Sequence, residues 1–332
     1  MVSGAILVTL PMSGAVTQIY SGVKEIGIID ILFDSGIANE MFPLLLFIGI
    51  GAMIDFGPLL SNPKLMLFGA AAQFGIFFTL SMAALFGFDL KDAASVAIIG
   101  AADGPTSIFV ANYLKSNYIG AIIVAAYSYM ALVPIVQPPV IRLITTKHER
   151  GIKMAYVQKE VKKSVRILFP IAITIVTGIV SPRSVALIGF LMFGNLIREC
   201  GVLNSLSESA QNNLANLVTL LLGITVASKM RADAFLTGQT LLILGLGLVA
   251  FVFDTVGGVL LAKFINLFTK NKINPMIGAA GISAFPMSAR VVHKMGLAED
   301  KTNYLLMHAI GVNVSGQIAS VIAGGLLLNM LG

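Results

Sequence analysis

The chain has 332 residues, of which 57% are hydrophobic and only 11% are charged, and its mean hydropathy is +0.90. Soluble domains carry about 25% charged residues, so this composition excludes an ordinary soluble protein and predicts an all-α polytopic membrane protein. The net charge of +6 does not point to nucleic acid as a partner, because an excess of Lys and Arg in a membrane protein reports the topology of its loops.

The first 40 residues differ in character from the rest of the chain. Residues 4–19 are apolar, but Pro11 and Gly14 interrupt them and leave them too short for a clear membrane span. Residues 22–40 mix acidic and basic side chains with Ile and Leu at near-helical spacing, which predicts an amphipathic helix at the membrane interface. We therefore expect residues 1–40 to form an apolar and interfacial segment ahead of a single membrane domain over residues 41–332.

Apolar segments dominate the remainder of the chain. Several of them are too short, or too often interrupted by Pro and Gly, to be simple spanning helices. The candidate spans lie at about 42–60, 64–88, 93–113, 118–144, 167–181, 184–198, 212–230, 236–267, 274–291 and 304–330.

One hydrophilic loop, residues 142–166, divides the membrane domain. It holds eight Lys or Arg residues against Glu149 and Glu160 only. The positive-inside rule places such a loop in the cytoplasm, and docking of an acidic partner is a second reading of the same charge. The loop separates two halves, about 41–145 and 167–332.

The first half contains an acidic residue at an interrupted apolar segment. Asp103 follows the apolar run that begins at Ala93 and is followed at once by Gly104 and Pro105. An ionised carboxylate at the centre of a membrane helix costs roughly 2.5–3.5 kcal/mol. Protonation or a bound cation would offset that cost, so the residue is a candidate for exchange between H⁺ and a metal ion. The alternative, an N-cap for the helix that resumes at Pro105, is compatible with this role.

The second half contains a comparable interruption over residues 274–290. Pro275 and Pro286 each remove a backbone donor, and glycines lie between them. Backbone broken at membrane depth must line a cavity or be buried in protein. Asn274, Ser283 and the freed carbonyl groups are hard oxygen donors that suit a small cation, although a polar loop between two helices is the simpler reading. Corresponding interruptions in two halves point to a transporter's binding site.

Further polar residues occur where the chain is otherwise apolar. Tyr127 and Tyr129 flank Ser128 shortly before Pro134, which favours a cavity wall over an interface anchor. Asn313 offers an amide oxygen to a cation or, equally, a hydrogen bond to another helix.

Two charged residues remain. Asp254, in a long apolar run, is either functional or paired with Lys263 or Lys229. Arg290 closes the second interruption, where its guanidinium would neutralise a buried Asp or hold an anionic substrate in a bidentate manner.

These motifs occur in the order found in one family. The sequence resembles the β subunits of the biotin-dependent sodium-pumping decarboxylases, which act in complexes on oxaloacetate, glutaconyl-CoA, methylmalonyl-CoA or malonate. The resemblance runs from about residue 36 to the C-terminus and rests on four motifs, namely Asp103–Thr106, Tyr127–Pro134, Asn274–Arg290 and Asn313.

The resemblance implies a carboxybiotin decarboxylase subunit in a prokaryotic cytoplasmic (inner) membrane that couples decarboxylation to Na⁺ export and consumes one proton. It implies an inverted-repeat, elevator-like transporter fold with two discontinuous helices. It further implies that a biotinylated carrier domain delivers carboxybiotin, and that a carboxyltransferase α subunit, a small membrane γ subunit and further copies of the chain share the complex. The residues that it associates with sodium binding and coupled decarboxylation are Asp103, Tyr129, Asn274, Gly278, Ser283, Arg290 and, at the ion site, Asn313.

Within this reading, Na⁺ binds to Asp103, Asn274, Gly278, Ser283 and Asn313. Its binding at Asp103 displaces a proton from Asp103 or from Tyr129, and Arg290 holds the carboxylate of carboxybiotin. The family usually has a further hydrophobic hairpin near the N-terminus, which we expect to be shortened here. An ion-coupled secondary carboxylate transporter without decarboxylase activity remains the alternative function, because broken repeats of this kind are common to transporters.

Overall fold

The computed structural model describes residues 2–10, 14–20, 23–155, 160–226 and 237–332. Nearly all of this chain is helical, apart from a short antiparallel hairpin formed by β1 (Gln18–Tyr20) and β2 (Val23–Glu25). Among the described residues, five helices are long and apolar enough to cross a membrane, or six if one bent pair counts as a span. The prediction of a polytopic helical membrane protein is therefore confirmed.

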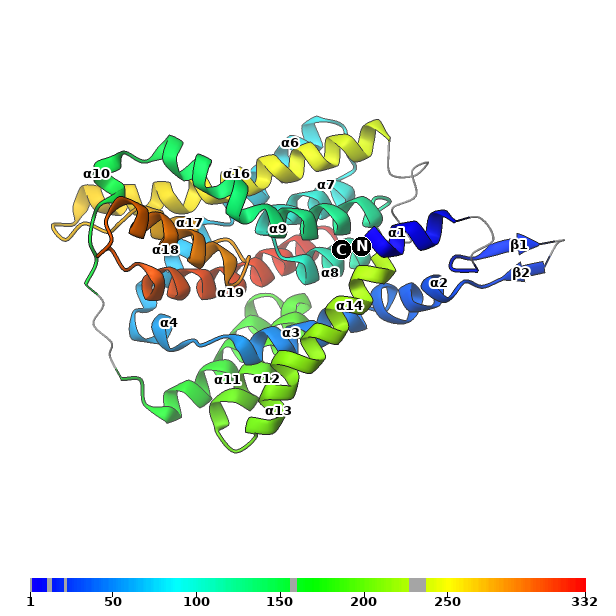
Figure 1. Cartoon of the computed structure of the whole chain (residues 1–332), viewed down its shortest axis with the longest axis horizontal. Helices are drawn as coiled ribbons and strands as arrows, with labels where there is room; N and C mark the ends of the chain where they lie inside the picture. Colours follow the sequence, from blue (N-terminus) through cyan, green and yellow to red (C-terminus); the bar gives the residue numbers. More distant parts are fainter. Residues whose placement is uncertain (1, 11–13, 21–22, 156–159, 227–236) are drawn as a thin grey trace.

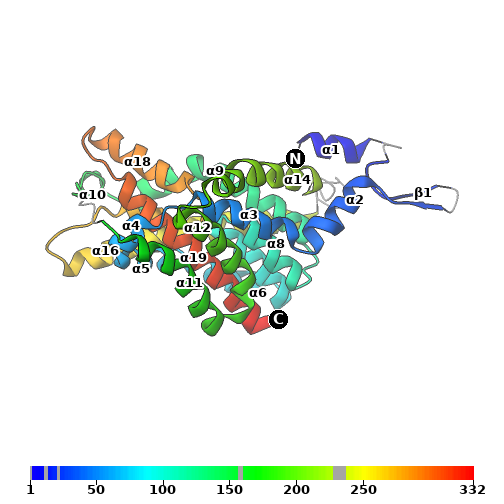
Figure 2. The same ribbon diagram turned by 90° about the horizontal axis from the view of Figure 1, so that it is seen from below.

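The N-terminal region contains α1 (Val2–Thr9), the hairpin, α2 (Ile28–Leu32), the π-helical η1 (Phe33–Ala38) and α3 (Met41–Met53). The amphipathic helix predicted over 22–40 is shorter than expected, since Lys24 and Glu25 lie in the hairpin. The backbone amide of Thr17 donates to Asp30 Oδ2 at 2.6 Å and that of Ile29 to the Ala15 carbonyl at 3.0 Å. These bonds tie the start of α2 to the preceding segment, and the hairpin projects from one end of the molecule (Figures 1 and 2).

The other elements follow the predicted order. The first half contains α4 (Gly57–Ser61), η2 (Pro63–Leu65), α5 (Met66–Ala71), α6 (Phe74–Leu85), α7 (Leu90–Ala97), η3 (Ile98–Ala101), α8 (Gly104–Tyr113), α9 (Ile119–Ile144) and α10 (Lys147–Arg150). The second half contains α11 (Lys163–Val180), η4 (Pro182–Ser184), α12 (Val185–Cys200), α13 (Asn204–Glu208), η5 (Ser209–Leu214), α14 (Ala215–Thr225), α16 (Gly238–Phe268), α17 (Met276–Ala279), α18 (Met287–Glu299) and α19 (Leu306–Leu331).

The helices form two groups with α19 between them. In Figure 1, α3 and α11 to α14 lie on one side, whereas α6, α9 and α16 lie on the other. The most apolar window of α19 is 67% buried inside the protein, against 11% for α11. A helix that is apolar all round is buried when other helices surround it, so α19 is the central helix and α11 a peripheral one.

Both predicted interruptions are present. The first separates α7 and η3 from α8, and the second separates α17 from α18. The apolar segment predicted over 64–88 is also interrupted, since Ala72 and Gln73 separate α5 from α6. Gly281, in the second interruption, packs against this third one, because a Cβ built on it would lie 2.6 Å from Ala72 Cβ.

The basic loop after α9 is fastened to the helices beside it by ion pairs. Arg150 Nε lies 2.5 Å from Glu299 Oε1, and Lys153 Nζ lies 2.8 Å from Asp300 Oδ2. The hydrogen bond from Lys153 holds the pKa of Asp300 well below its ordinary value. These ion pairs therefore connect the loop to the C-terminal end of α18, where Glu299 lies.

Candidate functional site

The first interruption lies at Ala102 and Asp103, between η3 and α8. Asp103 follows Ala102, whose φ of +51° lies in the left-handed region, a conformation that costs an L-residue about 1–2 kcal/mol. The side chain caps α8, since Asp103 Oδ1 accepts from the Thr106 amide at 3.2 Å and Oδ2 from the Thr106 hydroxyl at 2.7 Å. Asp103 is buried, with 4% of its surface exposed. The capping role is therefore real, and it leaves a carboxylate inside the protein without a basic partner among the residues that the structure describes.

The second interruption, residues 280–286, carries no charged side chain, and amides from two other helices hold its carbonyl groups. Gln137 on α9 donates to the Ala279 carbonyl at 2.7 Å. Asn313 on α19 donates to the carbonyls of Ala280 at 3.0 Å and Ile282 at 2.7 Å. Gln317, also on α19, donates to the Ser283 carbonyl. These bonds satisfy backbone groups that lipid cannot satisfy.

The two interruptions meet directly. The Ser283 amide donates to the Ala101 carbonyl at 3.0 Å, which joins backbone of the second interruption to backbone of the first. The Ser320 hydroxyl donates to Asp103 Oδ2 at 3.1 Å, and the Ser283 hydroxyl donates to the Gly316 carbonyl at 3.0 Å. Helix α19 therefore contacts both interruptions through a stripe of polar side chains and carbonyl groups.

That stripe supplies oxygen atoms suited to a small cation. Asn313, Gln317 and Ser320 are spaced by four and three residues, which places them on one face of α19. Among the described residues, the amide oxygens of Asn313, Gln317 and Gln137 are buried and have no hydrogen-bond partner. Buried polar groups normally have partners, and carboxylate and carbonyl oxygens are ligands that hard cations prefer. These oxygens and the Asp103 carboxylate are donors of the type that a small hard cation prefers.

The two tyrosines of α9 have different surroundings. The Tyr129 hydroxyl donates to the Leu244 carbonyl on α16, which directs it away from Asp103. Tyr127 instead packs on the first interruption, since a Cβ built on Gly104 would lie 2.5 Å from Tyr127 Cζ. Its hydroxyl is buried without a partner in the part of the chain that is described. Tyr127 is therefore the tyrosine beside Asp103, and the Tyr-Ser-Tyr spacing alone gave no means of choosing between the two.

Asn274 and Gly278 lie at the start of the second interruption and make other contacts. The Asn274 amide donates to the carbonyls of Arg150 and Ile152, both at 2.8 Å, in the basic loop. Its oxygen accepts from the Met276 amide at 3.1 Å. A Cβ on Gly278 would lie 2.0 Å from the Gly258 carbonyl oxygen. Asn274 thus connects the loop to α17, and Gly278 permits close packing of α17 on α16.

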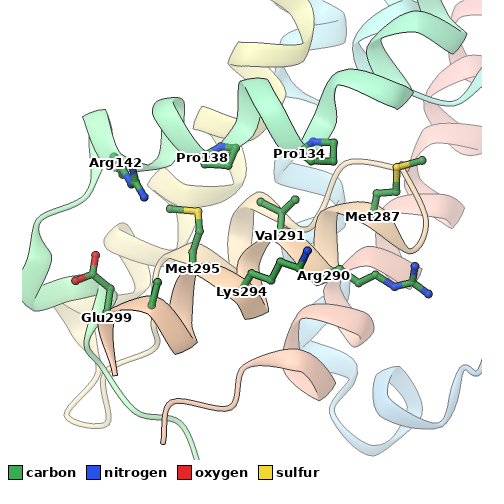
Figure 3. Close-up of a pocket in the computed structure, with 10 residues that line it drawn as sticks. Pro134, Pro138, Arg142, Met287, Arg290, Val291, Lys294, Met295 and Glu299 are labelled. Atoms are coloured by element: carbon green, nitrogen blue, oxygen red, sulfur yellow. The ribbon is translucent and has the colours of Figure 1, made fainter. Parts of the chain in front are cut away.

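Arg290 lines an open cavity of about 450 Å³ between α9 and α18 (Figure 3). The cavity also contains Arg142 and Lys294, and all three cations are exposed. None of the three has an ion pair among the described residues, whereas Glu299 at the far end is paired with Arg150. Met287, Val291, Met295 and two prolines of α9 supply apolar walls. The cavity therefore combines positive charge with apolar walls, which suits an anionic ligand with an apolar body.

A hydrogen-bonded pair lies between this cavity and the buried oxygens. Gln137 precedes Pro138 of the cavity wall, and Ser288 follows Met287. Gln137 Nε2 lies 3.1 Å from Ser288 Oγ, which itself donates to the Ala279 carbonyl at 3.1 Å. The structure thus brings Asp103, Ser283 and Asn313 together, and it places Asn274 and Arg290 on the side of the basic loop. It adds Gln137, Gln317 and Ser320, to which the sequence analysis assigned no role at the site.

A buried carboxylate facing neutral oxygens across two interrupted helices is an arrangement typical of ion transporters. The chain belongs to the family of the Na⁺-transporting oxaloacetate decarboxylase beta subunit, whose profile matches residues 1–331.

Characterised relatives agree with this assignment. The methylmalonyl-CoA decarboxylase subunit beta of Propionigenium modestum is 53% identical over 88% of this chain and 74% of its own length. The oxaloacetate decarboxylase beta chain of Haemophilus ducreyi is 50% identical over 92% and 71% of the two chains. The glutaconyl-CoA decarboxylase subunit beta of Acidaminococcus fermentans is 48% identical over 99% and 85%. The resemblance noted in the sequence is confirmed.

Proposed function

We propose that this chain is the carboxybiotin decarboxylase subunit of a biotin-dependent complex and couples that reaction to Na⁺ export across a prokaryotic inner membrane. The observation that carries the proposal is the contact between the two interruptions, in which the Ser283 amide donates to the Ala101 carbonyl at 3.0 Å beside Asp103. A buried carboxylate and unpartnered amide oxygens then share one site, as Na⁺ binding requires.

The reaction accounts for the cavity at Arg290. Carboxybiotin carries a carboxylate on a ring nitrogen; when that N–C bond breaks, CO₂ leaves and the nitrogen takes up one proton. Arg290, with Lys294 one turn along α18, would hold the anionic carboxylate, and the apolar walls would hold the ring. A charge-assisted bond of this kind contributes about 1.5–3 kcal/mol.

Coupling then follows from exchange at Asp103. Na⁺ that binds to the Asp103 carboxylate displaces a proton from it, or from a tyrosine hydroxyl nearby. Tyr127 has the closer position, whereas Tyr129 is engaged with the Leu244 carbonyl. We propose that the proton travels by way of the pair Gln137 and Ser288, whose chain neighbours Pro138 and Met287 line the cavity. The displaced proton is the one that the biotin nitrogen consumes.

Export requires that the site open to the other side. We propose that the two halves of the chain are inverted repeats and that one moves against the other in an elevator-like manner. A biotinylated carrier domain, a carboxyltransferase α subunit, a small membrane γ subunit and further copies of this chain would complete the complex. The relatives do not favour the alternative, an ion-coupled carboxylate transporter, since those compared here are decarboxylase subunits.

Purification and reconstitution test this function. The chain should copurify with a biotinylated protein, detected with avidin, and liposomes holding the complex should take up ²²Na⁺ when the complex's acid substrate is added. Blocking biotin with avidin should stop that uptake. A chain that purifies without any biotinylated protein and moves Na⁺ with a carboxylate instead would contradict the proposal.

A further inference from the structure

Asp254 is a further buried carboxylate, on helix α16, which packs on η3 just before the first interruption. None of the Asp254 surface is exposed. Its Oδ1 accepts from the Ile76 amide at 3.2 Å, so it caps the N-terminus of α6 from a neighbouring helix. This cap gives Oδ1 a hydrogen-bond partner but gives none to Oδ2.

The second oxygen faces the first interruption. Asp254 Oδ2 is buried without a hydrogen-bond partner among the described residues. A Cβ built on Gly100 would lie 3.0 Å from this oxygen, and 2.6 Å from Ala250 Cβ one turn away on α16. Gly100 belongs to η3, and Asp103 follows three residues later. The segment Ile98–Asp103 therefore meets the Asp254 carboxyl at Gly100 and the Ser320 hydroxyl at Asp103.

No basic side chain in the described structure compensates Asp254. Lys263, the partner that the sequence allowed, lies 3.1 Å from Glu149 Oε1 instead, and Lys229 lies outside the described residues. The packed elements α5, α6, η3 and α17 contain no titratable residue.

Two further helices pack on α16 and do contain titratable groups. Lys91 and Asp92 lie at the first turn of α7, with Asp92 bonded to Ser116 and Asn117. On α9, Tyr129 bonds to the Leu244 carbonyl, ten residues before Asp254. The α9 residues Tyr127 and Arg142 face Gly104 and the open cavity, respectively.

We propose that the Asp254 carboxyl is a proton-binding site whose occupancy is linked to Na⁺ binding at Asp103 through the segment Ile98–Asp103. An unpaired charge buried in this way is costly, and a proton on Oδ2 removes the charge while Oδ1 keeps its bond to Ile76. A Na⁺ ion that shifts the segment changes the surroundings of Oδ2 at Gly100. Two sites that bias one element affect each other's binding reciprocally. The proton site stands without the proposed function; only the identity of the linked ion rests on it.

Infrared spectroscopy of the purified complex tests this inference. At neutral pH the wild type should show a C=O band of a protonated carboxyl that Asp254→Asn lacks, and saturating Na⁺ should shift or remove that band. Asn retains an oxygen for the Ile76 amide, so the variant is expected to keep its fold, which thermal unfolding checks. Asp92→Asn is the matched control, because it makes the same change at another buried carboxyl group, which is bonded to Ser116 and Asn117, and it should leave the Asp254 band in place.

Two results would overturn the inference. If Asp254→Asn keeps every acid band of the wild type, then Asp254 is ionised. If ²²Na⁺ binds to the wild type and the band does not respond, the proton is a fixed structural feature. In Asp103→Asn the band should persist and no longer respond to Na⁺. Failure of ²²Na⁺ to bind to the wild type at all would count against the proposed function, and the band itself would still decide whether Asp254 carries a proton.

Discussion

The two interruptions of the membrane domain solve the same backbone problem in different ways. The first uses its own side chain: Asp103, which directly follows the left-handed Ala102, caps α8 through Thr106. The second uses no side chain charge and depends on the amides of Gln137, Asn313 and Gln317 from helices α9 and α19. The first therefore provides charge, whereas the second provides neutral oxygens and their surrounding donors.

This difference indicates how one site distinguishes an ion from a proton. A carboxylate binds either species, whereas in the proposed site the unpartnered amide oxygens of Asn313 and Gln317 would coordinate only a cation held between the two interruptions. If the two interruptions have these separate roles, variants of the first, charged interruption should abolish the dependence on Na⁺. Variants of the second, neutral interruption should weaken that dependence.

The largest effect is expected from Asp103→Asn. Loss of the Asp103 charge should lower Na⁺-stimulated decarboxylation by the assembled complex by about 100-fold, which corresponds to about 2.7 kcal/mol. Asp92→Asn, the same change at a buried carboxylate elsewhere, should leave the Na⁺ dependence unchanged. Retained Na⁺ stimulation in Asp103→Asn would show that the charge of the first interruption is not the coupling group.

Gly316→Ala should be next in size because it separates α19 from the neutral interruption. The new Cβ would lie 2.1 Å from the Gly281 carbonyl oxygen, and such overpacking costs about 1–3 kcal/mol. We expect a lower melting temperature in detergent and weaker Na⁺ stimulation. Gly245→Ala in α16 is the matched control, since its Cβ would have no atom within 4 Å; an equal loss in both variants would contradict the packing argument.

Asn313→Ala should weaken Na⁺ binding without abolishing turnover. The change removes a cation ligand and leaves the Ala280 and Ile282 carbonyls without their donor. We expect the Na⁺ concentration for half-maximal stimulation to rise about tenfold, equivalent to about 1.4 kcal/mol. Asn112→Ala is a close control, because Asn112 donates in the same way to the Ile37 and Ala38 carbonyls. An unchanged Na⁺ requirement in Asn313→Ala would remove Asn313 from the ion site.

Arg290→Lys should separate the cavity from the ion site. Lysine keeps the charge but loses bidentate geometry, so the KM for the carboxybiotin carrier should rise about fivefold, a change of about 1 kcal/mol. The Na⁺ requirement should stay as in the wild type. Should the Na⁺ requirement move and the KM for the carrier remain constant, the assignment of Arg290 to the carboxylate would be wrong.

The smallest effect concerns the loop at the end of α18. Lys153 holds the pKa of Asp300 well below its ordinary value, so this pair stabilises the fold above the ordinary Asp pKa and loses that contribution only as pH falls through the lowered value. Lys153→Met should slightly lower the melting temperature at neutral pH, and the difference from the wild type should vanish in strong acid. A constant difference at every pH would exclude the ion pair as its cause.

The sequence predicted those parts of this site that are energetically unfavourable in any membrane helix, whatever surrounds them. A charge at Asp103 and prolines at 275 and 286 contradict a membrane helix wherever they occur, so both interruptions were predictable. Gln137, Gln317 and Ser320 carry no such signal, because an amide or hydroxyl in a helix acquires its role only from the carbonyl it meets. The position of Tyr127 against Gly104 likewise depends on tertiary packing that the sequence does not reveal, and the hairpin at Lys24 depends on pairing between two three-residue strands.

The most direct test of the central claim is a pair of high-resolution cryo-electron microscopy maps of the assembled complex, one at saturating Na⁺ and one without Na⁺. We predict Na⁺-dependent density in contact with the Asp103 carboxylate and with the amide oxygen of Asn313 or Gln317, while the Ser283 amide stays bonded to the Ala101 carbonyl. Na⁺-dependent density away from Asp103, or maps at this site that are identical with and without Na⁺, would contradict the account.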